Sequence, residues 1–177
     1  NSVIQRGEAG DLIRVHEALH EKKVAAIADM VAQNPEIRLI TIAGPSSSGK
    51  TTFAQRLKIQ LRVNGLQPVT ISLDDYFLDR ASTPLGEDGK PDFESIEALD
   101  LSLLGDHLSR LIQGDTVEVP LFDFHTGERL ATTRQLTTGI DQPIIIEGIH
   151  GLNERLTESV PRGNKFKIYI SALTQIN

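Results

Sequence analysis

A glycine-rich segment, GPSSSGKTT, carries the most specific chemistry in this sequence. It has the spacing of a phosphate-binding loop, a glycine followed by four residues and then Gly49-Lys50-Thr51. In such a loop, backbone N–H groups surround phosphate oxygens, the lysine contacts the β- and γ-phosphates, and the threonine hydroxyl binds Mg²⁺. The residues predicted to bind the phosphates and the metal are Gly44, Ser46, Ser47, Ser48, Gly49, Lys50, Thr51 and Thr52.

The flanking sequence favours a phosphate loop over an ordinary capped turn with a solvated lysine. A β-branched run at 38–43 precedes the glycines and predicts a buried strand. A helical pattern at 50–63 follows them, and Asn64-Gly65 supplies a helix C-cap. Because phosphate binding needs a strand before the loop and a helix after it, both flanks fit that interpretation.

A second motif, His16-Glu17-Ala18-Leu19-His20, matches the H-E-x-x-H pattern of zinc peptidases. On a helix the two imidazoles would share one face, and Glu17 would act as general base. The charged residues that follow, Glu21, Lys22 and Lys23, are typical of a solvated helix face. We favour the solvated face and keep a zinc peptidase as the alternative.

Hydrophobic periodicity and turn residues divide the rest of the chain into strands, helices and one hairpin. The expected strands are 38–43, 68–73, 143–146 and 165–170; the expected helices are 11–32, 50–63 and 99–112; a loop covers 79–94; and a hairpin covers 116–137, with its turn at His125-Thr126-Gly127. Strands that alternate with helices predict an α/β fold, with a mostly parallel central sheet and helices on both faces.

Acidic residues follow two of the expected strands. The carboxyl ends of parallel strands meet at one edge of a sheet, so Asp74, Asp75 and Glu147 should lie near the phosphate loop. A carboxylate directly after an apolar strand is poorly solvated unless a metal or a hydroxyl pairs with it. The predicted metal ligands are therefore Thr51, Asp74 and Glu147, although Glu147 could instead cap a helix and the two aspartates could form a solvated turn.

A kinase also needs a base that accepts the proton of a substrate hydroxyl. Asp74 is the better candidate and Asp75 the weaker one, and Lys50 is the second expected catalytic residue. Aromatic and polar side chains nearby could shape an acceptor pocket, with core packing as the alternative for each aromatic. The residues predicted to contact the acceptor are Asp74, Tyr76, Phe77, Phe93, Phe122, His125 and Arg129.

Bulk composition excludes several classes of protein. The net charge of −6 argues against binding to nucleic acid, which requires a basic face. The absence of cysteine excludes disulfides and thiolate zinc sites. No apolar run approaches the roughly 20 residues of a membrane-spanning helix. We expect a cytoplasmic protein without a membrane partner, and the sequence leaves oligomerisation open.

Four motifs taken together resemble a known family. In this order and at these separations, GPSSSGKTT, ISLDDYF, PLFDFHTGER and IIIEGIHG resemble the uridine kinase and phosphoribulokinase branch of P-loop kinases, over roughly residue 38 to the end. The resemblance implies a P-loop NTPase-type three-layer fold with a β-hairpin insertion, and ATP- and Mg²⁺-dependent phosphorylation of a small-molecule hydroxyl. In uridine kinases that hydroxyl is the 5′-hydroxyl of a pyrimidine nucleoside.

The same resemblance assigns roles by position. Asp74 matches the family's catalytic aspartate and Glu147 its strand-end glutamate near the metal, while Phe93, Glu94 and the hairpin at Phe122 match its nucleoside-contact region. Two positions differ: uridine kinases carry a tyrosine where Phe122 stands and a histidine where Gly127 stands. A nucleoside is the leading acceptor, and the alternatives are a sugar phosphate, a pantothenate-like molecule, or a nucleotide-binding module without catalysis.

The expected domain organisation is an N-terminal helical segment at 1–36 that packs on a kinase domain at 37–177. Members of the resembled family have an arginine-bearing lid after the fourth strand, and we expect that region to be absent from these residues. The first residue is Asn1 rather than methionine, which suggests a piece of a longer protein. A subset of the family joins the kinase module to a tRNA-synthetase-like N-terminal half, which would explain that start.

Overall fold

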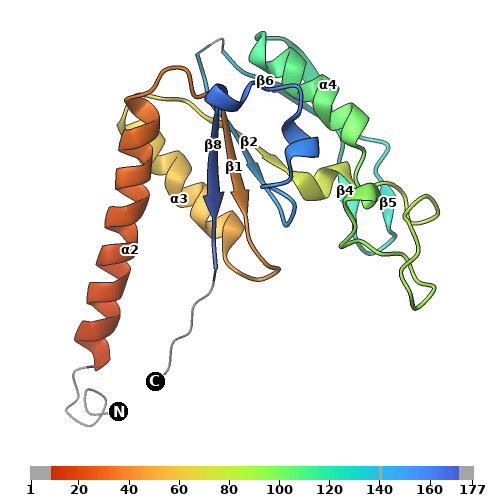
Figure 1. Cartoon of the computed structure of the whole chain (residues 1–177), viewed down its shortest axis with the longest axis horizontal. Coiled ribbons are helices and arrows are strands. Elements are labelled where there is room, and N and C mark those ends of the chain that lie inside the picture. The colour runs from red at the N-terminus through yellow and green to blue at the C-terminus, as the bar shows by residue number, and fades with distance from the viewer. Residues whose placement is uncertain (1–8, 140, 172–177) are drawn as a thin grey trace.

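The computed structural model of the chain describes residues 9–139 and 141–171 (Figure 1). Strands and helices alternate along most of this length, as the sequence predicts. The α-helices are α2 (Ala9–Ala32), α3 (Lys50–Val63) and α4 (Leu101–Ile112); the strands are β1 (Leu39–Ala43), β2 (Val69–Ser72), β3 (Thr116–Val119), β4 (Phe122–Asp123), β5 (Glu128–Arg129), β6 (Arg134–Thr137), β7 (Ile144–Glu147) and β8 (Lys165–Tyr169). Short 3₁₀ turns cover Leu73–Tyr76, Ile96–Ala98, Glu154–Thr157 and Arg162–Asn164.

The central sheet is four-stranded, with the order β2-β7-β1-β8 and parallel pairing throughout. Its central strands are apolar and β-branched because both faces are covered. Along β7, Ile144 and Ile146 join the core on one face, whereas Ile145 joins the core on the other. This period-two alternation into two separate cores gives three layers, and it confirms the predicted α/β fold.

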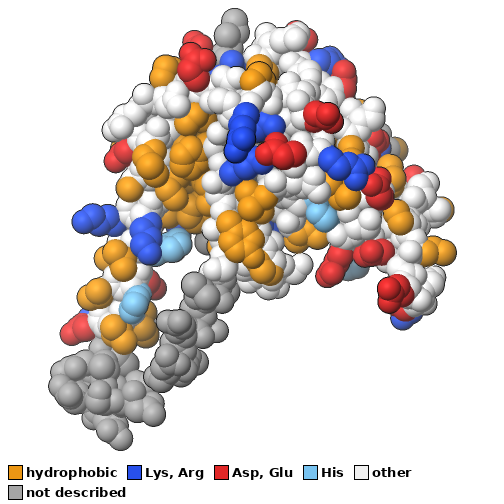
Figure 2. Space-filling model, viewed as in Figure 1, with side chains coloured by type: hydrophobic (Ala, Val, Ile, Leu, Met, Phe, Trp, Pro, Cys, Tyr) orange, Lys and Arg blue, Asp and Glu red, His pale blue; other side chains and the backbone are white. Residues whose placement is uncertain are grey.

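Helices α2 and α3 cover one face of the sheet. Leu57 and Leu61 of α3 pack on the sheet, while Val24 and Ala28 of α2 belong to the same core. The first turns of α2 extend beyond the sheet (Figure 1), and apolar side chains such as that of Val15 are exposed there. Figure 2 shows hydrophobic side chains along this part of the helix. Within the described ranges, no helix is both long enough and apolar enough to cross a membrane.

Helix α4 and the hairpin cover the other face. Leu104 and Leu108 of α4 pack in the same core as Val117 of β3. The predicted hairpin is present, but it consists of two separate ladders, β3 with β6 and β4 with β5. The ladder breaks after β3 at Pro120, which lacks the N–H group that a ladder needs.

Two element ends differ from the prediction at places that matter for the site. Strand β2 ends at Ser72 rather than at residue 73, because the hydroxyl of Ser72 accepts a hydrogen bond from the Asp74 N–H (3.3 Å) and starts the 3₁₀ turn. Helix α4 begins at Leu101, where Asp100 accepts a hydrogen bond from the Leu103 N–H (3.0 Å) as the N-cap. Both starts are set by side-chain caps that periodicity does not detect.

Close packing after β7 predicts a stability difference between two glycine substitutions. A Cβ atom at Gly151 would lie 2.7 Å from the backbone oxygen of Ile42, whereas a Cβ atom at Gly105 in α4 would meet nothing within 4 Å. We expect Gly151→Ala to lower the free energy of unfolding by about 1–3 kcal/mol through overpacking. Gly105→Ala should raise it by up to about 1 kcal/mol through helix propensity. Urea denaturation of both variants measures the two changes, and a neutral Gly151→Ala would contradict this packing.

Candidate functional site

The glycine loop lies between the end of β1 and the start of α3. Two of its residues have left-handed backbone, Ser47 with φ 59° and Gly49 with φ 85°. Such alternating conformations turn successive N–H groups toward one point, which forms an anion-binding concavity. Gly49 is also the N-cap of α3, and because glycine has no side chain, it offers no side-chain acceptor to the first amides of the helix. The loop therefore has the shape that a phosphate group requires.

Side chains within the loop support the same conclusion. The Oγ atom of Ser48 is buried without a hydrogen-bond partner, and a bound phosphate oxygen would satisfy it. The ammonium group of Lys50 donates to the backbone oxygen of Pro45, 2.7 Å away, and so lies over the loop. Gly44 has no room for a side chain, since a Cβ atom would collide with the backbone oxygen of Ile170. These residues fit the phosphates of a nucleotide.

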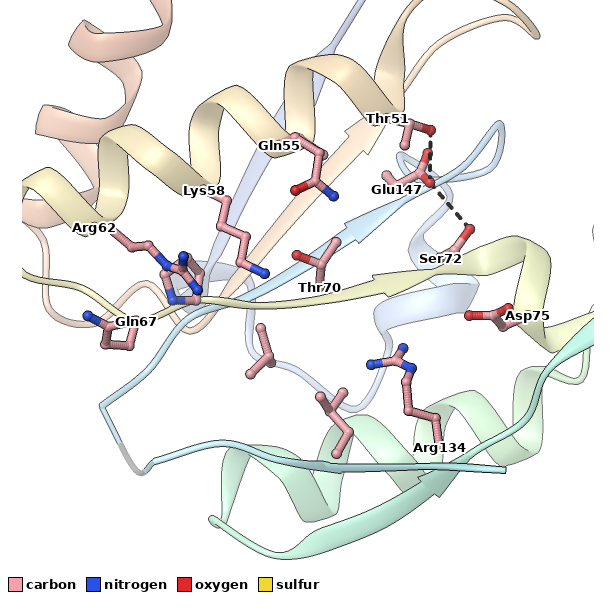
Figure 3. A pocket seen from close by; sticks show the side chains of 14 residues that line it. Thr51, Gln55, Lys58, Arg62, Gln67, Thr70, Ser72, Asp75, Arg134 and Glu147 are labelled. Atoms are coloured by element: carbon pink, nitrogen blue, oxygen red, sulfur yellow. Dashed lines mark hydrogen bonds between the residues drawn. The ribbon is translucent and has the colours of Figure 1, made fainter. Parts of the chain in front are cut away.

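The carboxylate of Glu147 is the most deeply buried acidic group at the carboxyl edge of the sheet, with 8% of the residue exposed. It accepts hydrogen bonds from the hydroxyl groups of Thr51 (3.2 Å) and Ser72 (3.3 Å), as Figure 3 shows. No ion pair within 4 Å involves Glu147 in the described part of the chain. A buried carboxylate beside two hydroxyls and no cation fits Mg²⁺, which favours oxygen ligands and often takes one or two from protein.

Strand register explains why these three side chains meet. Ser72 of β2 and Ile42 of β1 are both register partners of Glu147. Residues in one row of a parallel sheet point to the same face, and Ile42 belongs to the core beneath α3. Glu147 and Ser72 therefore face α3, whose first turn carries Thr51.

Ser72 is the residue at this edge that the sequence prediction missed. Its hydroxyl donates to Glu147 and also accepts from the Asp74 N–H, so it connects the buried carboxylate to the turn that carries Asp74. The available signal was its position, two residues before Asp74 on a strand that ends in polar residues. Which face Ser72 occupies depends on register, and register is not visible in one sequence.

Burial and a neighbouring charge shift the pKa of Asp74 in opposite directions. Its side chain opens onto a cavity, and desolvation by the surrounding protein raises its pKa above the usual aspartate range. The ammonium group of Lys50 partly offsets this by lowering the pKa. The adjacent carboxyl, Asp75, also has a raised pKa because of burial, but it lines a different cavity.

One cavity of about 360 Å³ brings most of the predicted site residues together. Phosphate-loop residues, Asp74 and Glu147 line one side, and aromatic residues line the other. The lining consists of Ser46, Ser47, Lys50, Thr51, Asp74, Phe77, Phe93, Glu94, Phe124, Glu147 and Ile149. Of the other predicted loop residues, Gly44, Ser48, Gly49 and Thr52 belong to the loop and the first turn of α3 but do not line this cavity.

The aromatic side of the cavity is a cluster of four phenylalanines. Phe77 packs edge-to-face against Phe93 (5.4 Å between ring centroids), and Phe122 packs edge-to-face against Phe124 (5.0 Å). Phe124 is 55% exposed and lines the cavity, whereas Phe122 does not line it. Phe77, Phe93 and Phe124 therefore form the aromatic wall of the cavity, and Phe122 packs against Phe77 and Phe124 without lining the cavity itself.

Besides Phe122, three residues predicted to contact the acceptor do not line this cavity. Tyr76 is fully buried in the core, with its hydroxyl 2.9 Å from Nδ1 of His107. The guanidinium of Arg129 is occupied by the backbone oxygens of Tyr76 and Phe77 and by the Asp100 carboxylate. His125 is in the exposed hairpin turn, where its N–H donates to Asp123. The structure does not bring these three side chains into the cavity, because hairpin and turn residues can bind backbone groups or enter the core as readily as they line a pocket.

The H-E-x-x-H motif is on α2, away from the cavity. His20 lies 3.3 Å from the Arg56 guanidinium and packs edge-on against Phe53, and His16 is exposed. Across 9–139 and 141–171, no group of three His, Cys, Asp or Glu side chains is arranged to hold a metal ion. Nothing in this arrangement supports a zinc peptidase.

Because burial raises the pKa of Asp74 and Lys50 lowers it, replacing Lys50 should change that pKa measurably. In the nucleotide-free protein, NMR titration of the Asp74 carboxyl should give a pKa above that of an unfolded aspartate. Lys50→Met removes the neighbouring positive charge, so the Asp74 pKa should rise further and the carboxylate should protonate at a higher pH. Lys90→Met, on an exposed loop, is the matched control and should leave it unchanged. An Asp74 pKa that falls in Lys50→Met would contradict this assignment.

Comparison with known proteins identifies relatives of this chain. The profile of the Phosphoribulokinase / Uridine kinase family matches residues 39–177. A uridine kinase from Vibrio campbellii is 33% identical over 121 residues, which make up 67% of this chain and 56% of that protein. A uridine kinase from Chloroflexus aurantiacus is 38% identical over 112 residues, 63% of this chain and 51% of that protein. The chain thus spans little more than half the length of these relatives.

A solved structure shows the same fold. A possible uridine kinase from Bacillus stearothermophilus superposes with a TM-score of 0.59 at 22% identity, covering 80% of this chain and 78% of that one. The family match covers the sheet, the phosphate loop and every residue of the cavity lining. The resemblance noted in the sequence is therefore confirmed, and the chain belongs to the phosphoribulokinase / uridine kinase family.

Proposed function

We propose that this chain transfers the γ-phosphoryl group of ATP, with Mg²⁺, to a hydroxyl group of a nucleoside. The observation that carries the proposal is that Lys50, Thr51, Asp74 and Glu147, from three separate strand ends, line one cavity. The relatives described as uridine kinases support a hydroxyl acceptor of this class.

Each of these residues has a role that its position supports. The loop amides and Lys50 would bind the phosphates, and Thr51 and Glu147 would hold Mg²⁺, which neutralises charge on the phosphates when bound. Asp74 opens onto the same cavity and would accept the proton of the attacking hydroxyl. Its raised pKa makes it a stronger base than an ordinary aspartate, which favours that role.

The aromatic wall favours a nucleoside over the other acceptors. Phe77, Phe93 and Phe124 present ring surface on which a flat base can stack. Glu94 and Asp74 offer carboxylate oxygens to ribose hydroxyls. A sugar phosphate would need a second cation, and Lys50 is the one cationic side chain among the described residues that line this cavity.

We also propose how the two segments of the chain are organised and where the protein acts. We infer that the helical segment at 1–36 and the kinase domain at 37–177 act as one unit, since α2 shares a core with α3. A cytoplasmic location, where ATP is available, and a small-molecule partner are consistent with kinase activity. The arginine-bearing lid that the family resemblance implies lies outside the described residues.

Substitution of Asp74 tests the proposed base. In a panel of nucleosides with MgATP, the protein should release ADP only when an acceptor is present. Asp74→Asn should lower kcat by about 10²-fold or more, because the hydroxyl proton loses its acceptor, and should leave ATP affinity largely unchanged. A coupled ADP assay and calorimetry with ATP measure the two effects.

The neighbouring Asp75→Asn is the matched control, because it removes a carboxylate of the same type that lies outside this cavity. It should retain kcat within a few-fold of the wild type. ATP binding without turnover for any acceptor would indicate a nucleotide-binding module, and ADP release that is independent of acceptor would indicate a simple ATPase.

A further inference from the structure

A second and larger cavity, of about 520 Å³, lies at the open edge of the sheet beside β2 (Figure 3). Helix α3, strand β2 and strand β6 of the hairpin form its walls. The polar side chains that line it include Gln55, Lys58, Arg62, Gln67, Thr70 and Arg134. It meets the first cavity only at Thr51 and Glu147, which line both.

Three cationic side chains enter this cavity. Lys58 and Arg62 are one turn apart on α3, and Arg134 extends from β6 (Figure 3). None of the three takes part in an ion pair within 4 Å among the residues the structure places. By contrast, Arg56 on another face of the same helix pairs with Glu21 (3.7 Å). Like charges four residues apart on a helix repel each other, so an anion bound between Lys58 and Arg62 would stabilise both.

The opposite wall also offers hydrogen-bonding groups without a partner. The Val69 N–H donates to Pro143 on the β7 side (3.2 Å), so the N–H and C=O of Thr70, the next residue, point away from β7. β2 is the outermost strand, and this edge faces the cavity. The Oγ atom of Thr70 is buried there with no hydrogen-bond partner. The amides of Gln55 and Gln67 line the same space.

The charges are distributed unevenly along the cavity. Asp75 and Glu147 are at the end nearest the phosphate loop, and Asp75 lies near Arg134 (Figure 3). Lys58 and Arg62 lie farther from that end, along α3 (Figure 3). An anionic group would therefore lie toward Lys58 and Arg62, while a neutral part with hydroxyl groups would extend toward Asp75 and Ser72. A volume of this size suits a small molecule.

We propose that this β2-edge cavity binds a phosphorylated small molecule, with its phosphate group held between Lys58 and Arg62. Guanidinium and ammonium groups together with amide donors are the groups that recognise phosphate in proteins. The occupant would contact Ser72 and Glu147 and would thereby reach the residues proposed to hold Mg²⁺. Its binding should change the apparent Mg²⁺ requirement of the first site.

Calorimetric titration of inorganic phosphate into the full chain tests the proposal. Saturating MgADP is present throughout, so that the phosphate loop is already filled. The wild type should bind one phosphate, and Lys58→Gln with Arg62→Gln should weaken that binding at least tenfold. Arg56→Gln removes one charge from the same helix outside the cavity and should leave it unchanged. Equal affinity in the double variant, or no phosphate binding to the wild type once MgADP is bound, would overturn the proposal.

Two further ligands identify the source of the phosphate group. A nucleoside 5′-monophosphate that binds beside the nucleoside acceptor, and that binds more weakly to the double variant, would identify the reaction product as the occupant, whereas displacement by the acceptor with equal affinity in the double variant would place it in the proposed active site and count against this cavity. A sugar phosphate that binds without such competition would identify a separate effector. The kinase assay stays independent of this test, because Lys58 and Arg62 do not line the proposed active site and the double variant should keep its acceptor-dependent ADP release.

Discussion

The site depends on one buried carboxylate. Glu147 lies at the carboxyl end of an apolar central strand, where leaving it without a partner would be costly. Its hydrogen bonds join Thr51 at the start of α3 to Ser72 at the end of β2, and Ser72 in turn caps the turn that carries Asp74. Through these contacts the positions of the phosphate loop, the proposed metal ligands and the proposed base are coupled. The parallel register of β2, β7 and β1 maintains this geometry.

A second set of contacts holds the hairpin and Phe77 beside the aromatic side of the cavity. Arg129 joins the hairpin to the backbone of Tyr76 and Phe77 and to Asp100 at the start of α4. Its carboxylate partner and two backbone oxygens are half-buried, so the loss of any one of them would leave a charged or polar group unsatisfied. Arg129 therefore holds the backbone of Phe77 in place, and under the proposed function its effect on the acceptor would be through Phe77 rather than by direct contact.

Sequence reasoning succeeded where the signal is local. The glycine spacing around Lys50, the β-branched strands and the carboxylates after them depend on neighbouring residues, and they predicted the sheet, the loop and the common cavity. Ser72, Tyr76 and Arg129 depend on register and on which side of a turn faces the core. Tyr76 and Phe77 are adjacent and both belong to the core, yet only Phe77 also lines the cavity. One sequence does not distinguish these two environments.

Thr51 and Glu147 are proposed to form the magnesium site beside the phosphate loop. Crystals grown with an ATP analogue and Mn²⁺ in place of Mg²⁺ test it most directly, because anomalous scattering locates the metal independently of activity. We expect a single strong peak at about 2.0–2.3 Å from the Thr51 hydroxyl, with Glu147 bound to the metal directly or through one water. A metal bound to the phosphates but remote from both side chains would show that Thr51 and Glu147 are not its ligands.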